Sequence, residues 1–262
     1  MHSGSENILL TSIQDGVATV TLNRPQARNA LSIELMTEVE SALARLAQDA
    51  SVKALVLAAN GPAFCAGHDL KQMSGLSGPD AVEAVFAQCS RVMKAIVRFP
   101  RPVIAKVHAM ATAAGCQLVA SCDLAYAADT AQFATPGVNI GLFCSTPMVA
   151  LSRNVGRKQA MELLLLGKPV DAARAESWGL INRAVPAAEL DGVVAEAAAV
   201  LASKSPYTLR VGKEAFYQQA EMGLDDAYDY ATRVMVANMQ AKDAAEGIDA
   251  FLGKRHPVWC GA

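Results

Sequence analysis

Two apolar segments that each lead into a run of small residues constrain the fold of this chain most strongly. The first is 54–58, which reads as a buried parallel strand and is followed by Gly61-Pro62-Ala63-Phe64-Cys65-Ala66-Gly67-His68-Asp69-Leu70-Lys71. The second is 103–107, which leads through small residues into a helix that includes Gly115. Both predict a strand, a tight turn and a helix N-terminus, which is the repeating unit of an α/β sheet. Open α/β sheets bind ligands at the edge where such turns lie.

Other local patterns support an α/β arrangement of residues 1–204. Asp15-Gly16 lies between two apolar segments, 8–13 and 17–22, and predicts a β-hairpin. Ser32 is typical of an N-cap, and we expect a helix of about 18 residues after it. The remaining expected elements are strands at 53–58, 103–107, 123–127 and 180–185, and helices at about 80–98, 147–154, 157–166, 171–178 and 187–203, with a loop at 133–147.

The pattern changes from Ser205 onward. Three helical segments, at about 206–220, 224–240 and 242–252, follow one another without a strand. We therefore expect residues 205–262 to form a separate helical lobe. Its apolar stripes predict packing on the lobe's own core or on a neighbouring subunit rather than ligand binding.

The composition excludes several classes of function. The net charge of −2 and the scattered Lys and Arg residues provide no footprint for nucleic acid. No apolar run approaches the ~20 residues of a membrane span. Residues 1–6 show no targeting peptide, and six cysteines without a C-x-x-C pair indicate reduced thiols, so we expect a cytoplasmic protein. The low charged fraction, 18%, suggests that other subunits cover part of the surface.

The two turns are candidates for an oxyanion hole, in which backbone N–H groups stabilise a negatively charged oxygen. The N–H of His68 would be one donor, and the N–H of Ala114, where the chain enters a helix, would be the other. Preorganised donors of this kind contribute ~10²–10³ in rate each. The spacing alone is equally compatible with two tight packing turns that bind nothing.

Several motifs together resemble the crotonase (enoyl-CoA hydratase/isomerase) family. Segments 61–71 and 110–123 resemble its two signature segments, and Asn23-Arg24-Pro25 with Asn29-Ala30-Leu31 resembles its N-terminal motif. Residues 131–136 and 163–179 match in kind and order, and 141–147 is similar to the branch of hydratase-domain-containing proteins with a Gly-His-Asp-Leu core, which includes a mitochondrial form. The resemblance implies a crotonase-like ββα spiral core, a helical C-terminal lobe, and homotrimers or homohexamers.

The resemblance also assigns a substrate site. It implies an acyl-CoA thioester as substrate, with no separate cofactor and no metal. The thioester oxygen would lie between the N–H groups of His68 and Ala114, and the adenine and phosphates would lie near Arg24, Arg28 and Lys71. The residues that the resemblance places along the bound substrate are Arg24, Arg28, Ala66, His68, Asp69, Leu70, Lys71 and Ala114.

Two positions depart from the family pattern. Typical hydratases hold and activate a water with two glutamates, which would fall at Gln117 and Gly137. A glutamine amide can orient a water but cannot accept its proton at neutral pH, and glycine can do neither. General acid–base catalysis contributes roughly 10²–10⁴ per group, so hydration is expected to be weak. Ordinary double-bond isomerisation, which needs a carboxylate near Gly137, is disfavoured for the same reason.

The candidates to replace the two glutamates are His68 and the polar or soft groups just after Gly137, which are Asn139, Cys144, Ser145 and Thr146. The His68 ring either takes part in proton transfer or only packs. Cys144 is disfavoured as a nucleophile because no base adjoins it in the sequence. Asp69 is expected to cap the turn, and Asp123 is expected to be structural.

Three hypotheses follow for the function. The first is an enoyl-CoA hydratase of fatty-acid metabolism with weak hydration, in which His68, Ala114 and Gln117 are the catalytic residues. The second is a decarboxylase of malonyl- or methylmalonyl-CoA, because loss of CO₂ generates the enolate without a carboxylate base. The third is an acyl-CoA-binding protein without turnover.

Overall fold

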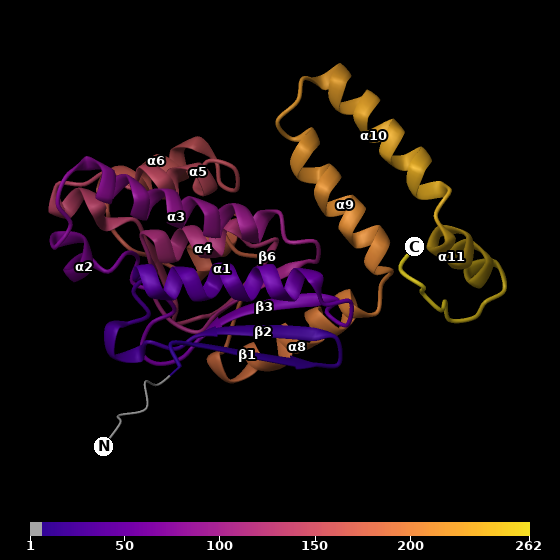
Figure 1. The fold of residues 1–262 in the computed structure, drawn as a ribbon, viewed down its shortest axis with the longest axis horizontal. Helices are drawn as coiled ribbons and strands as arrows, with labels where there is room; N and C mark the ends of the chain where they lie inside the picture. The colour runs from indigo at the N-terminus through magenta and orange to yellow at the C-terminus, as the bar shows by residue number, and fades with distance from the viewer. Residues whose placement is uncertain (1–6) are drawn as a thin grey trace.

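A six-stranded sheet forms the centre of the protein, as a computed structural model of residues 7–262 shows (Figure 1). Residues 1–6, on which the prediction of no targeting peptide rests, lie outside the described residues. β1 and β2 form the predicted antiparallel hairpin, and the other neighbours are parallel. The strands, in spatial order, are β1 (Leu9–Gln14), β2 (Val17–Leu22), β3 (Ala54–Ala59), β4 (Val103–Val107), β6 (Leu124–Ala128) and β9 (Arg183–Val185).

Helices cover both faces of the sheet, because alternate side chains of a strand point to opposite faces. Leu55 and Leu57 of β3 belong to the larger core cluster, in which α1 (Ile33–Gln48), α3 (Pro79–Val97) and α4 (Ala114–Ser121) bury their apolar residues. Val56 and Ala58 belong to the second cluster, with α8 (Leu190–Ala202). Figure 1 shows α1 and α8 on opposite sides of the strands.

A small second sheet corrects one prediction. The segment 133–147, expected to be a loop, contains β7 (Gln132–Ala134) and the 3₁₀ helix η2 (Pro136–Ile140). β7 pairs with β5 (Ala111–Thr112) and β8 (Val170–Asp171). These strands are two or three residues long and are stabilised by partners far along the chain, so no local periodicity reveals them.

Boundaries at two further elements also differ from expectation. The strand expected at 180–185 begins at Arg183, and the helix expected at 187–203 begins at Leu190, because Ala187–Glu189 forms the 3₁₀ helix η3. The other short elements are η1 (Pro25–Ala27), α2 (Leu70–Ser74), α5 (Ser145–Leu151), α6 (Arg157–Leu166) and α7 (Ala172–Ser177).

Three helices, α9 (Pro206–Gln219), α10 (Leu224–Met239) and α11 (Lys242–Leu252), confirm the helical C-terminal region and extend away from the sheet (Figure 1). Large apolar side chains stay exposed on them, among them Tyr228 at 70% and Phe251 at 82%. A domain boundary near residue 204 and a role of this region in oligomerisation remain predictions. None of the helices in the described part of the chain is long and apolar enough to span a membrane.

A buried ion pair attaches α9 to the sheet. The Asp123 carboxylate, just before β6, accepts hydrogen bonds from the Lys213 Nζ at 2.7 Å, the Tyr217 hydroxyl at 2.9 Å and the Val103 N–H at 2.7 Å. The Lys213 side chain is only 8% exposed and also donates to the carbonyls of Ile96 and Arg101. The structural role predicted for Asp123 is therefore confirmed.

We expect Lys213→Met to lower the free energy of unfolding by about 3–5 kcal/mol, because it leaves a largely buried carboxylate without its cation. The matched control is Lys106→Met, whose ion pair with the exposed Asp191 should contribute less than about 1 kcal/mol. Urea denaturation of both variants checks this. An equally small loss in both variants would mean that the Lys213 pair does not hold α9 in place.

Candidate active site

The turn after β3 and the turn after β4 lie side by side at the C-terminal ends of these parallel strands, which form one edge of the sheet. Cys65 forms an isolated parallel bridge with Ala111. The Thr112 N–H donates to the Cys65 carbonyl at 2.9 Å, and the Phe64 N–H donates to the Met110 carbonyl at 2.9 Å. Because β3 and β4 are parallel, both turns leave the same edge, which is the edge that the sequence predicts for a ligand site.

The backbones of the two turns approach so closely that glycine is required at two positions. A Cβ on Gly67, whose φ is +88°, would lie 2.9 Å from the Ala113 Cβ and 3.4 Å from the Ala114 nitrogen. A Cβ on Gly115 would lie 2.1 Å from the Cys65 carbonyl oxygen. His68 directly follows Gly67, so this contact brings the segment that contains His68 against the start of α4.

The N–H groups of His68 and Ala114 make no hydrogen bond to a protein acceptor within residues 7–262. Ala114 is the first residue of α4, where a helical N–H has no partner within the helix. Ala113 before it has φ 50° and ψ −117°, a conformation that costs a non-glycine residue about 1–3 kcal/mol. Its N–H donates to the Ala134 carbonyl at 2.8 Å, and this bond helps to hold the strained residue in place.

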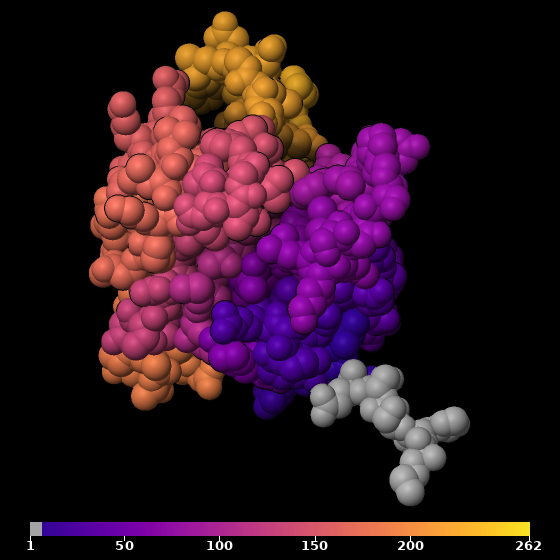
Figure 2. All heavy atoms as spheres, turned by 90° about the vertical axis from the view of Figure 1, so that its left-hand side faces the viewer, coloured from indigo at the N-terminus to yellow at the C-terminus, as the bar shows by residue number. Residues whose placement is uncertain are grey.

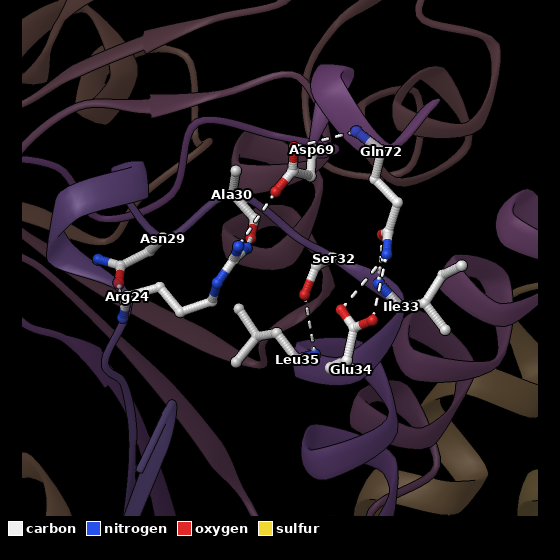
Figure 3. A network of polar contacts seen from close by, with 9 residues as sticks. All are labelled: Arg24, Asn29, Ala30, Ser32, Ile33, Glu34, Leu35, Asp69 and Gln72. Atoms are coloured by element: carbon white, nitrogen blue, oxygen red, sulfur yellow. Dashed lines mark hydrogen bonds and ion pairs between the residues drawn. The ribbon is translucent and has the colours of Figure 1, made fainter. Parts of the chain in front are cut away.

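The loop 23–31 clamps the first turn from outside. The Leu31 N–H donates to the Gly67 carbonyl at 2.7 Å, and the Asp69 N–H donates to the Leu31 carbonyl at 3.1 Å. The Arg24 guanidinium bridges the Asp69 carboxylate at 3.1 Å and the Ala30 carbonyl at 2.5 Å (Figure 3). Loop and turn therefore form one hydrogen-bonded unit.

Asp69 caps α2, as the sequence predicts. Its carboxylate accepts a hydrogen bond from the Gln72 N–H at 3.3 Å. Burial raises the pKa of the Asp69 carboxyl, but the hydrogen bonds from Arg24 and the Gln72 N–H outweigh this, and the pKa lies below its ordinary value.

Two positioning residues were missed by sequence reasoning. Asn29 is fully buried, and its amide donates to the carbonyls of Asn60 and Ala63 at 2.8 Å. The Gln72 side chain accepts from the Ile33 N–H at 2.8 Å and donates to the Glu34 carboxylate (Figure 3). Asn29 lies within the N-terminal motif, which is a signal for it. Gln72 has no such signal, because its partners belong to a different helix.

The structure brings the predicted substrate-binding residues to this edge. Figure 2 shows the corresponding face, where the α2–α3 segment (purple) lies beside the middle of the chain (pink). The Ala66 N–H donates to the Arg28 carbonyl at 3.0 Å, and the side chains of Arg28 and Lys71 are exposed. Leu70 is 54% exposed. The Arg24 guanidinium, by contrast, is held between Asp69 and Ala30. Contact of any of these residues with CoA remains a prediction.

Neither of the two positions that the resemblance assigns to a family glutamate, 117 and 137, carries a carboxylate. Gln117, in α4, is 4% exposed. A Cβ on Gly137 would lie 2.7 Å from the Leu142 carbonyl oxygen and 2.9 Å from the Cys144 sulfur. Burial raises the pKa of the Cys144 thiol, which favours packing over nucleophilic attack. The space that a side chain at 137 needs is therefore filled.

Four buried side-chain atoms around the turns have no hydrogen-bond partner within residues 7–262: His68 Nε2, His108 Nδ1, Gln117 Oε1 and Thr135 Oγ1. His108 directly follows β4, and its Nε2 lies 2.8 Å from the Gly61 carbonyl oxygen. Buried polar atoms are generally paired, so unpaired ones near a turn indicate a place for a polar ligand atom or water. Thr135, which no sequence motif singles out as a site residue, follows Ala134, whose carbonyl accepts the hydrogen bond from the Ala113 N–H.

The His68 ring packs edge-on against Phe86, with 5.0 Å between the ring centroids. Burial lowers the pKa of this histidine below 6.5, so the ring is neutral at pH 7. Within residues 7–262 no group of three or more side chains of the metal-ligating types is found.

Comparisons with known proteins agree with this architecture. The family model for enoyl-CoA hydratase/isomerase matches residues 12–262. A rat protein, enoyl-CoA hydratase domain-containing protein 3, mitochondrial, is 46% identical over 249 residues, which cover 95% of this chain and 83% of the rat protein. The crystal structure of enoyl-CoA hydratase from Mycobacterium smegmatis has a TM-score of 0.95 at 50% identity and covers 97% of this chain and 99% of that chain. The human hydratase domain-containing protein 3 has a TM-score of 0.94 at 45% identity and covers 97% and 100%.

These relatives overturn one prediction. The absence of a visible targeting peptide in residues 1–6 and the six cysteines without a C-x-x-C pair predict a cytoplasmic protein. The rat relative is named as a mitochondrial protein, which contradicts that prediction.

The matched region spans both turns, the loop 23–31 and the C-terminal helices. The structural neighbours share the whole architecture at high identity, which confirms the predicted crotonase-like fold. The chain therefore belongs to the enoyl-CoA hydratase/isomerase, or crotonase, family.

Proposed function

We propose that this hydratase-like enzyme binds an acyl-CoA thioester and stabilises its enolate or oxyanion between the N–H groups of His68 and Ala114. The contact of Gly67 with Ala113 and Ala114, together with two N–H groups that have no acceptor in residues 7–262, supports this site. The positive end of α4 adds a favourable potential for negative charge. Arg28 and Lys71, both exposed, would bind the CoA phosphates.

Hydration of 2-enoyl-CoA would be slow at this site. Addition of water needs a base to take its proton, and Gln117 can only orient that water through the amide oxygen that lacks a partner. Gly137 has no side chain, and Cys144 occupies the space beside it.

The lack of a base at positions 117 and 137 also supports a second function, decarboxylation of a malonyl-type CoA. Breaking the bond between the α-carbon and the carboxylate leaves the electron pair on the enolate and releases CO₂ without a base. The oxyanion hole would supply most of the stabilisation.

The test is a comparison of two substrate panels. We expect hydration of crotonyl-CoA and longer 2-enoyl-CoAs to be at least ~10² slower than in a hydratase with both glutamates. Release of CO₂ from malonyl- or methylmalonyl-CoA above background would favour the decarboxylase. Hydration at the rate of a hydratase with both glutamates would contradict the claim that Gln117 and Gly137 make hydration slow. Tight acyl-CoA binding without turnover in both panels would identify a binding protein.

Restoring the first carboxylate should change the rate in a defined direction. We expect Gln117→Glu, a substitution of nearly equal volume, to raise crotonyl-CoA hydration by roughly 10–100-fold because it supplies a base. Gly137→Glu should give no such gain and should lower the melting temperature, since its Cβ would contact the Leu142 carbonyl at 2.7 Å. Gln117→Ala is the control for Gln117→Glu. Equal rates for Gln117→Glu and wild type would show that position 117 does not face the reacting water.

A substitution of His68 distinguishes the role of its imidazole ring from the role of its backbone N–H. Because burial lowers the pKa of His68, its contribution to stability is complete above pH 6.5 and declines as the pH falls below 6.5. We expect His68→Phe to remove this part of the acid sensitivity and to retain turnover within about 3-fold, since the N–H at position 68 is unchanged. Stability at pH 5 and pH 7, and turnover of the best substrate at pH 7, are the measurements. A 100-fold loss of turnover would show that the ring transfers a proton.

A further inference from the structure

A cavity lies at the ends of β3 and β4 opposite to the two turns. Lys53 precedes β3 and Arg101 precedes β4, whereas the turns follow these strands. A strand rises about 3.3 Å per residue, so β3 separates the two edges by roughly 20 Å. The cavity has a volume of about 310 Å³ and is lined by Ala50, Lys53, Arg101, Pro206, Tyr207, Arg210, Trp259, Cys260 and Gly261.

Three cations line this cavity, and no carboxylate does. Among the ion pairs of residues 7–262, none includes Lys53, Arg101 or Arg210. Two nearby carboxylates are already occupied. Asp243 accepts hydrogen bonds from the Ser205 hydroxyl and from the N–H groups of Cys260 and Gly261, and the other, Asp123, pairs with Lys213.

The Arg101 guanidinium is fixed in position. Its Nε donates to the Val52 carbonyl at 2.9 Å and its Nη1 to the Pro100 carbonyl at 3.0 Å. Burial, together with the nearby charge of Arg210, lowers the pKa of Arg101. Because Arg101 and Arg210 both line the cavity, an anion bound there would reduce the repulsion between their like charges.

The other walls suit a ligand that carries both phosphate and a flat ring. The N-terminal end of α9, a 14-residue helix, begins at Pro206 and adds positive potential. The Trp259 indole is held by its Nε1, which donates to the Ser203 carbonyl at 2.8 Å. The Tyr207 ring lies 5.4 Å from the Arg210 guanidinium carbon.

We propose that this cavity binds a small phosphate-bearing anion, independently of the thioester site. Guanidinium groups and helix N-termini both recognise phosphate, and the volume is at the lower end of the range for small-ligand pockets. Its walls come from the sheet and from α9, so an occupant links the two.

Isothermal titration with pyrophosphate, and separately with ADP, tests the proposal on the full chain. The variant Lys53→Ala/Arg210→Ala removes two exposed cations without breaking any ion pair of the described residues. It should fold normally and weaken binding of either probe by ~10-fold or more. For the binding that Lys53→Ala/Arg210→Ala weakens, tighter binding of ADP than of pyrophosphate would identify a nucleotide, whereas equal binding would identify phosphate alone as the recognised group.

One single variant is the control. Lys158→Ala removes an exposed cation on α6 and should bind pyrophosphate as the wild type does. Arg28→Ala removes a cation at the thioester edge, so it reports any pyrophosphate that binds there instead of in the cavity. Absence of pyrophosphate binding, binding that Lys53→Ala/Arg210→Ala leaves unchanged, or a loss confined to Arg28→Ala would each overturn the proposal.

Discussion

The close approach of two backbone turns is the constraint on which the rest of the site depends. Gly67 and Gly115 lie where any side chain would collide with the neighbouring turn. Ala113, in the second turn, has a strained backbone conformation, and the close approach places the start of α4 beside the segment that contains His68. The parallel register of β3 and β4 makes the approach possible, because both strands end at the same edge. The two parallel strands, the two turns and the N-terminus of α4 therefore hold one another in place.

The loop 23–31 gives this unit its rigidity. Arg24 and Asp69 are both mostly buried, so their ion pair is shielded from water and also satisfies the Ala30 carbonyl. These hydrogen bonds fix the turn without a ligand, and the proposed stabilisation of an oxyanion requires such a preorganised site. In the proposed function, backbone N–H groups at the two turns stabilise the negative charge, because Gln117 and Gly137 provide no carboxylate.

The opposite edge of the sheet has a different role. There, Asp123 and Lys213 attach α9 through a buried ion pair, and Arg101 contributes its carbonyl to the same lysine. The guanidinium of Arg101 lines the cationic cavity. The junction between the sheet and the C-terminal helices thus contains both a buried ion pair and cations that have no carboxylate partner among the described ion pairs. Exposed apolar residues on α10 and α11 lie beyond this junction and are available for packing against other chains.

Local sequence determined the hairpin, the longer helices, the buried strands and the two small-residue turns, because periodicity and glycine placement act over short distances. The motifs also determined the family and the loss of both acids. Tertiary structure alone decided the strands β5, β7 and β8, the engagement of Arg24 with Asp69, and the filling of the space beside Gly137 by Cys144. It also decided the partners of Asn29 and Gln72. Each of these depends on atoms that are distant along the chain and become neighbours only after the sheet has assembled.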